Sequence, residues 1–184
     1  MLDCCKRTNY NLIGGRIKEY GEIRNYQGFI HQNKNSLVYE KLNISSEDIQ
    51  ACDLTFNYFV AETEAVKKTK WDENIKVAYE HSTFFLDFKN KGYKTGFKKD
   101  AIVIHKPQII IQDKEEYREY QTYRSRKSDK EYFFKKYILD FVIDMRGRKD
   151  IYDGTGMSEI DFLITHFERK ECLERLLFSI AKYN

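Results

Sequence analysis

The stretch HSTFFLDFKNKGYKTGFKKDAIVIH, residues 81–105, has the clearest structural pattern in the chain. Its phenylalanines recur at the spacing of one helix face: Phe84, Phe85 and Phe88. We therefore expect residues 81–91 to form a helix that packs this face into the core. Gly92 stands where a helix C-terminus favours glycine, so the helix is expected to end there.

Strands are expected on both sides of this helix. After it come Tyr93–Phe97 and Ala101–His105, and the second of these is apolar and β-branched, as is typical of a buried strand. Before it, Leu54–Val60 is expected to be a strand and Glu62–Lys68 a short helix. This order predicts an α/β fold in which a mixed sheet carries flanking helices.

The remaining segments suggest how the chain is divided. Short apolar runs separated by turn residues before residue 43 predict a meander of strands. Glycines set among charged residues predict a linker over residues 141–158. A strand at Ile160–Ile164 and an amphipathic helix at Arg169–Tyr183 then begin a new unit. The expected parts are therefore residues 1–140, 141–158 and 159–184.

Composition excludes several classes of protein. The chain has 184 residues, of which 41% are hydrophobic, so it can bury the core of one domain. Its 32 basic and 29 acidic residues are interspersed and leave a formal charge of +3, so no nucleic acid partner is expected. No transmembrane run of about 18 apolar residues and no apolar signal segment occur. The four cysteines lack metal or disulfide spacing, which favours a cytoplasmic chain that could be peripheral at the membrane, with a lumenal compartment as the alternative.

Several motifs follow one another at plausible spacing. They are Asp53–Ala61 (DLTFNYFVA), Lys70–Lys76 (KWDENIK), Glu80–Phe85 (EHSTFF) and Val103–His105, with Leu12–Gly15 (LIGG) upstream. This order resembles the acceptor-side half of GT-A glycosyltransferases, in particular the β-1,4-N-acetylgalactosaminyltransferase-like branch and related family 2 enzymes. The resemblance covers roughly residues 8–135, and each motif alone is weak.

A second segment resembles another part of the same fold. Asp161–Leu173 (DFLITHFERKECL) is similar to the first strand and helix of the nucleotide-binding half. In the family that unit comes first, so we expect the end of one transferase module and the start of the next, with a circular permutation as the alternative. Family members hold Mn²⁺ or Mg²⁺ with an Asp-x-Asp motif, which none of the 29 acidic residues forms. The resemblance thus implies an incomplete GT-A fold, with Mn²⁺ or Mg²⁺ as cofactor only if the missing half is supplied.

The resemblance also assigns acceptor-side roles. Glu80 and His81 correspond to the pair that takes the proton of the acceptor hydroxyl, and either of them could be the base. Trp71, the only tryptophan, could stack on a sugar ring or could anchor its loop in the core. Asn57 could hydrogen-bond an acceptor sugar or be a satisfied strand asparagine.

Donor-side roles follow in the same way. Gly14 and Gly15 would allow a ligand to approach the backbone, or would simply form a bulge or turn. Thr165 and Arg169 correspond to the place where the fold grips uridine and diphosphate; otherwise they are a helix cap and a solvated side chain. His105 corresponds to the histidine that completes the metal shell, or is a strand-end histidine satisfied by backbone or water.

These roles predict a glycosyltransferase that moves a hexose or N-acetylhexosamine from a UDP-sugar to a glycan acceptor. We expect the isolated chain to be inactive, because the metal motif is absent. Further glycosyltransferase modules are expected partners. The alternative is a non-catalytic remnant that binds glycan or a partner protein through its aromatic surface.

Overall fold

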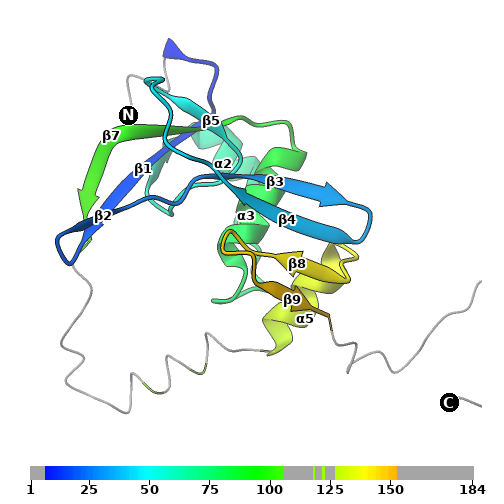
Figure 1. Ribbon diagram of the computed structural model, residues 1–184. Helices are drawn as coiled ribbons and strands as arrows, with labels where there is room; N and C mark the ends of the chain where they lie inside the picture. Colours follow the sequence, from blue (N-terminus) through cyan, green and yellow to red (C-terminus); the bar gives the residue numbers. More distant parts are fainter. Residues whose placement is uncertain (1–6, 106–117, 119–121, 123–126, 153–184) are drawn as a thin grey trace, which may run out of the picture. The chain divides into compact units, whose positions relative to one another are not determined.

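A computed structural model describes residues 7–105, 118, 122 and 127–152 (Figure 1). All of them belong to one compact unit, residues 1–153. The expected strand and helix after residue 159, together with Thr165 and Arg169, lie outside the described residues. The class of fold is confirmed as mixed α/β, because helices pack on two mixed sheets.

The larger sheet has the strand order β2-β1-β7-β5, and β6 also pairs with β1. Its strands are β1 (Leu12–Glu19), β2 (Glu22–Arg24), β5 (Gln50–Cys52), β6 (Phe59–Ala61) and β7 (Thr95–Ile104). Only β1 and β7 run parallel, while the other pairs are antiparallel. A parallel pair needs a long crossover, and here the intervening chain includes the helices α2 (Thr63–Thr69) and α3 (Glu80–Asn90).

The smaller sheet has the order β3-β4-β8-β9. It joins the hairpin of β3 (Gly28–Asn33) and β4 (Ser36–Lys41) to a second hairpin, β8 (Phe141–Ile143) and β9 (Lys149–Ile151), through the parallel pair β4–β8. The expectation of a linker over residues 141–158 is therefore wrong for β8 and β9. Both strands are hydrogen-bonded parts of the sheet, and Val142 in β8 is only 4% exposed.

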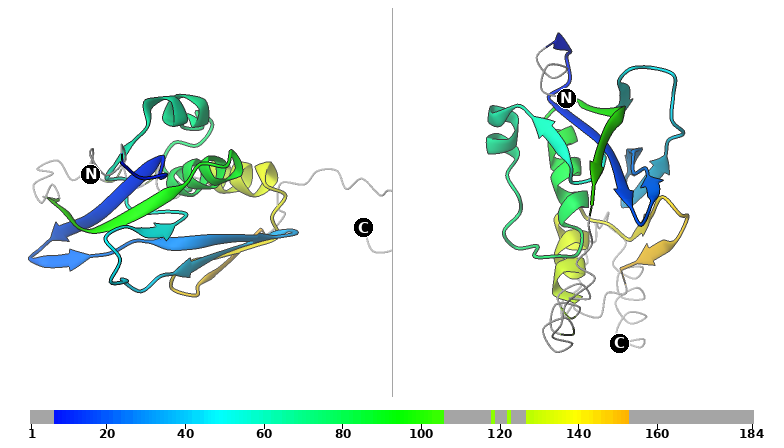
Figure 2. Two further views of the ribbon diagram at one scale, coloured as in Figure 1. Left: turned by 90° about the horizontal axis from the view of Figure 1, so that it is seen from above. Right: turned by 90° about the vertical axis from the view of Figure 1, so that its left-hand side faces the viewer.

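The core lies between the sheets and the helices α3 and α5 (Lys127–Lys136), which both lie on one side of the sheets (Figure 2). Helix α3 confirms the helix expected from the phenylalanine spacing, because Phe84, Phe85 and Phe88 are at most 1% exposed. The helix ends before Gly92, whose positive φ of 80° favours glycine. Two phenylalanines of α5, Phe133 and Phe134, are equally buried in the same core.

Two strand expectations are wrong. The segments Tyr93–Phe97 and Ala101–His105 are not separate strands, because β7 runs without interruption from Thr95 to Ile104. Its second half is also not buried, since Ile102 is 41% and Ile104 68% exposed. This half pairs with the end of β1, which in turn pairs with β2, a strand whose three residues are all exposed, so that part of the sheet extends beyond the core.

The expected strand Leu54–Val60 is also interrupted. Leu54 forms only an isolated bridge with Gly28, and regular pairing begins again at β6. The Asp53 carboxylate accepts a hydrogen bond from the backbone N–H of Ile30, at 2.8 Å, and pairs with Lys89. The hydrogen bond to Ile30 attaches the chain at Asp53 to β3 of the smaller sheet. The chain then continues to β6 in the larger sheet.

Candidate functional site

The candidate site lies at the beginning of α3. The preceding residue, Tyr79, has a left-handed backbone with φ 65°, which is costly for a residue other than glycine. Its ring stacks on Phe133 of α5 with centroids 4.4 Å apart, and its hydroxyl donates to Asp150. Packing from α5 therefore holds the turn that directs Glu80 and His81 outward.

Three of the predicted site residues come together at this turn. Trp71 stacks on Phe84, with ring centroids 4.4 Å apart and an interplanar angle of 19°, and the His81 ring meets its edge at 6.0 Å. The Nε2 atom of His81 lies 3.8 Å from Oε1 of Glu80. Trp71 is 39% exposed, while the side chains of His81 and Glu80 are 42% and 31% exposed. An aromatic ring, an imidazole and a carboxylate are thus accessible from solvent at one place.

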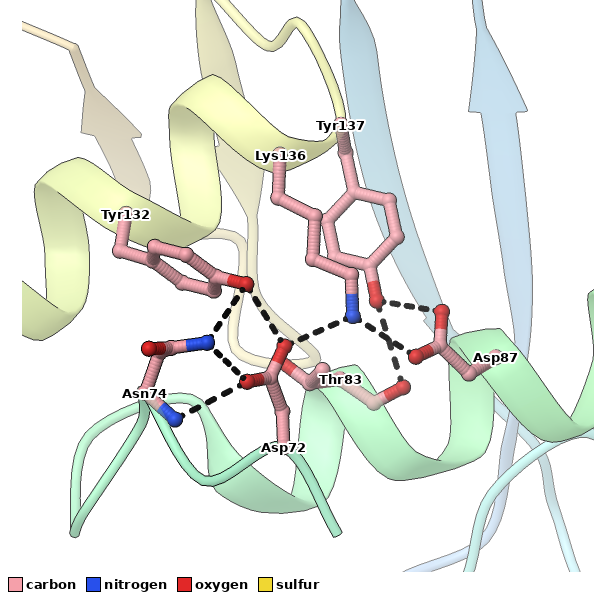
Figure 3. A network of polar contacts seen from close by, with 7 residues as sticks. All are labelled: Asp72, Asn74, Thr83, Asp87, Tyr132, Lys136 and Tyr137. Atoms are coloured by element: carbon pink, nitrogen blue, oxygen red, sulfur yellow. Dashed lines mark hydrogen bonds and ion pairs between the residues drawn. The ribbon is translucent and has the colours of Figure 1, made fainter. Parts of the chain in front are cut away.

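The loop that carries Trp71 is fixed by a network of polar contacts (Figure 3). Asp72 accepts hydrogen bonds from the backbone N–H of Asn74 at 3.0 Å, the Tyr132 hydroxyl at 3.1 Å and the Lys136 ammonium at 2.9 Å. Lys136 also pairs with Asp87 of α3 at 2.8 Å. One ammonium of α5 therefore links the Trp71 loop to the helix that bears Glu80 and His81.

The charges in this network stabilise one another. Burial by itself would raise the pKa of Asp72, but hydrogen bonds from Lys136, Asn74 and Tyr132 outweigh it and lower this pKa below its usual range. Burial likewise would lower the pKa of Lys136, and its contacts with Asp87 and Asp72 raise it instead. Both residues are charged near neutral pH, so the link between them is an ion pair.

Gly14 and Gly15 are buried in the middle of the larger sheet. A Cβ atom on Gly14 would collide with the side chain of Thr55, and one on Gly15 would collide with the Ala101 carbonyl. The register of β1 against β7 shifts between Gly14 and Arg16. The close approach that glycine allows here is therefore made by protein atoms at a bulge, which was the simpler of the two expectations.

Asn57 and His105 belong to other segments of the chain than this cluster. Asn57 is exposed in the segment between β5 and β6. His105 directly follows β7, a strand of ten residues. Its contacts are with β1, since its Nδ1 lies 2.8 Å from Oε1 of Glu19 and its backbone N–H donates to Lys18.

His105 does not fit a metal site in the part of the chain that is described. Glu19, its partner, already pairs with Arg24 at 2.6 Å, so the charge of this carboxylate is balanced by a guanidinium. Among the described residues, no group of three or more His, Cys, Asp or Glu side chains could hold a metal ion. One imidazole and one neutralised carboxylate are too few ligands for Mn²⁺ or Mg²⁺.

Sequence reasoning did not find the residues that fix the segment after Trp71. They are Tyr132, Lys136 and Asp87, together with Asp129, whose carboxylate accepts hydrogen bonds from the backbone N–H groups of Lys76, Val77 and Ala78. A signal for three of them was present, because Asp129, Tyr132 and Lys136 are spaced by three and four residues in a segment with a helical pattern. Such a stripe is typical of a solvated helix face, however, and only the fold shows what it contacts.

Comparison with models of known protein families finds no family that matches this chain, and comparison with curated proteins finds no match. Neither comparison therefore indicates a class of protein. Of the helices that the structure describes, none has the length and apolar character needed to cross a bilayer.

Proposed function

We propose that this chain provides the acceptor-side part of a GT-A-type glycosyltransferase, which binds a sugar of a glycan acceptor over Trp71 at the beginning of α3. The observation that carries the proposal is the group formed by Trp71, His81 and Glu80. These residues belong to two separate motifs of the glycosyltransferase resemblance, and the fold makes them neighbours.

Trp71 suits the apolar face of a sugar ring. An indole in a polar loop is normally costly to expose, yet 39% of Trp71 is accessible. Its ring is held by the stack on Phe84, so little conformational entropy remains to be lost when a ligand binds. A pyranose lying against this ring would contact it through its C–H groups and leave its hydroxyls free for polar partners.

Glu80 and His81 suit the proton transfer that the reaction requires. A hydroxyl oxygen can lie about 2.8 Å from both the Glu80 Oε1 and the His81 Nε2, because these atoms are 3.8 Å apart. In an inverting transfer this oxygen attacks the anomeric carbon of a UDP-sugar, and the bond from that carbon to the diphosphate breaks. The hydroxyl proton passes to His81 or to Glu80, and the diphosphate leaves with the bonding electrons.

The donor side of the reaction is not assigned to described residues. The leaving diphosphate gains negative charge, which a cation must stabilise. Among the described residues, His105 has too few partners for a metal site, and Arg169 and Thr165 lie outside that part of the chain. The hexose or N-acetylhexosamine donor, the metal and further glycosyltransferase modules therefore remain parts of the proposal that come from the sequence resemblance.

Calorimetric titration of the full chain with a panel of hexose and N-acetylhexosamine mono- and disaccharides tests the proposal. We expect at least one saccharide to bind, and Trp71→Ala to reduce its affinity about tenfold, as expected for loss of a major aromatic contact. Tyr20→Ala is the matched control, because Tyr20 is an aromatic residue that is 65% exposed in the β1–β2 turn. Absence of binding by every saccharide, or equal effects of the two variants, would contradict the proposal.

A further inference from the structure

Helix α5 presents three polar side chains toward the segment that leads into the candidate site. Asp129, Tyr132 and Lys136 are spaced by three and four residues, so they share one face of the helix. Each contacts the segment between α2 and α3, and Lys136 contacts α3 as well. Figure 3 shows the contacts of Tyr132 and Lys136. The contacts are spread along the segment from Asp72 to Ala78.

Asp129 holds the later part of this segment. Its Oδ2 atom accepts hydrogen bonds from three successive backbone N–H groups, those of Lys76, Val77 and Ala78, at 3.0, 3.1 and 3.4 Å. The residue is only 2% exposed. A buried carboxylate with three backbone donors fixes the chain strongly, so this end of the segment is held in place independently of Lys136.

Lys136 holds the earlier part. Asp72, the residue after Trp71, is bound to the ammonium, and the same ammonium binds Asp87 of α3. Asp87 also accepts from the Tyr137 hydroxyl at 2.7 Å, so its carboxylate is fixed by the last residue of α5 and by the residue after it. The side chains of Asp72 and Lys136 are 11% and 26% exposed, so water screens this pair less than an ordinary surface pair.

We propose that Lys136 is a positioning residue, which keeps Trp71 stacked on Phe84 beside His81 by tying Asp72 to Asp87. Without the ammonium, two carboxylates would face each other across the gap between loop and helix, and their repulsion would favour an open loop. The purpose of this positioning rests on the proposed function, but the positioning itself can be measured without any sugar.

Trp71 reports the effect directly, because it is the only tryptophan of the chain. The experiment measures acrylamide quenching of Trp71 fluorescence in the full chain with Lys136→Met. We expect the quenching constant to rise about twofold, since a more open loop exposes the indole to the quencher. Lys136→Arg should restore the wild-type value, because a guanidinium can bind both carboxylates.

Lys130→Met is the matched control on the same helix. Lys130 pairs with Asp150 at 2.6 Å and makes no described contact with the Trp71 loop, so its loss should leave the quenching unchanged. If Lys136→Met does not fold, Asp72→Asn replaces it in the same comparison. A wild-type quenching constant in Lys136→Met or in Asp72→Asn would overturn the inference. An equal rise of this constant in Lys130→Met would also overturn it. Failure of every saccharide to bind, with this quenching pattern intact, would overturn the proposed function alone.

Discussion

At the scale of one residue, Gly14 in β1 is packed too closely for a side chain. Its missing side chain leaves the space that buried Thr55 fills, and an added methyl group would overlap Thr55. We predict that Gly14→Ala lowers the free energy of unfolding by about 2 kcal/mol, because overpacking a rigid core forces neighbours to shift. Urea denaturation followed by circular dichroism measures the change.

Gly92→Ala provides the comparison. Nothing lies within 4 Å of a Cβ on Gly92, so its cost comes only from the positive φ of 80°. We expect about 1 kcal/mol for this variant. If Gly14→Ala were no more destabilising than Gly92→Ala, packing against Thr55 would not be the reason for glycine in β1.

The burial of single residues could be predicted from the sequence where a local pattern determined their surroundings. The spacing of Phe84, Phe85 and Phe88 depends only on helix geometry, and these residues are buried as expected. Lys136 could not be predicted in this way, because its partners Asp72 and Asp87 lie 64 and 49 positions away. Such a contact follows from the tertiary fold, which a local pattern does not contain.

The β8–β9 hairpin is the element whose role differs most from the expectation. Because β8 pairs with β4 and buries Val142, the hairpin closes the smaller sheet over the core. We predict that Val142→Ala lowers the free energy of unfolding by about 2 kcal/mol, through lost burial and the cavity that remains. Ile151→Ala in β9, where the side chain is 53% exposed, should change it by less than about 0.5 kcal/mol. If Val142→Ala left the free energy of unfolding unchanged, the result would favour the linker that the glycines predicted.

The link between α5 and the Trp71 loop gives a prediction on acid stability. The folded pKa of Asp72 is lowered, so its stabilising contribution is present above its unfolded value and is lost as the pH falls through the folded value. We therefore expect Asp72→Asn to destabilise the protein most near about pH 6, and its effect to shrink toward about pH 3. Lys136, with its raised pKa, stays charged over this range.

Urea midpoints of the wild type and of Asp72→Asn across this pH range provide the measurement. Asp140→Asn, at an exposed carboxylate, controls for the general effect of removing one negative charge. A difference between wild type and Asp72→Asn that does not depend on pH would show that Asp72 contributes through its shape alone.

Whole helices or strands could be predicted where one hydrophobic periodicity extended over several residues. Helices α3 and α2 lie within one residue of their expected bounds. For α3 the apolar spacing and the glycine after the helix agree. The exposure of Ile102 and Ile104 could not be predicted, since an apolar run looks the same whether or not neighbouring elements cover it. Gly147 likewise lies in the turn of the β8–β9 hairpin, where a linker would have the same composition.

At the scale of the whole molecule, we predict that the purified chain does not transfer sugar from UDP-sugars in the presence of Mn²⁺ or Mg²⁺. The described part offers no group of side chains that could hold the ion, and departure of UDP requires its charge. Release of UDP, measured with and without acceptor saccharides, checks this. Metal-dependent turnover that disappears in His81→Ala would show that the chain completes its own donor site.

The central claim is that the acceptor sugar binds on Trp71 at the beginning of α3. Labelling the full chain with 5-fluorotryptophan places one fluorine at this position, because Trp71 is the only tryptophan. The fluorine resonance should shift during titration with the tightest-binding saccharide of the panel, and its midpoint should equal the calorimetric dissociation constant. A saccharide that binds by calorimetry while this resonance stays unchanged would contradict the claim, and so would a panel in which no saccharide moves it.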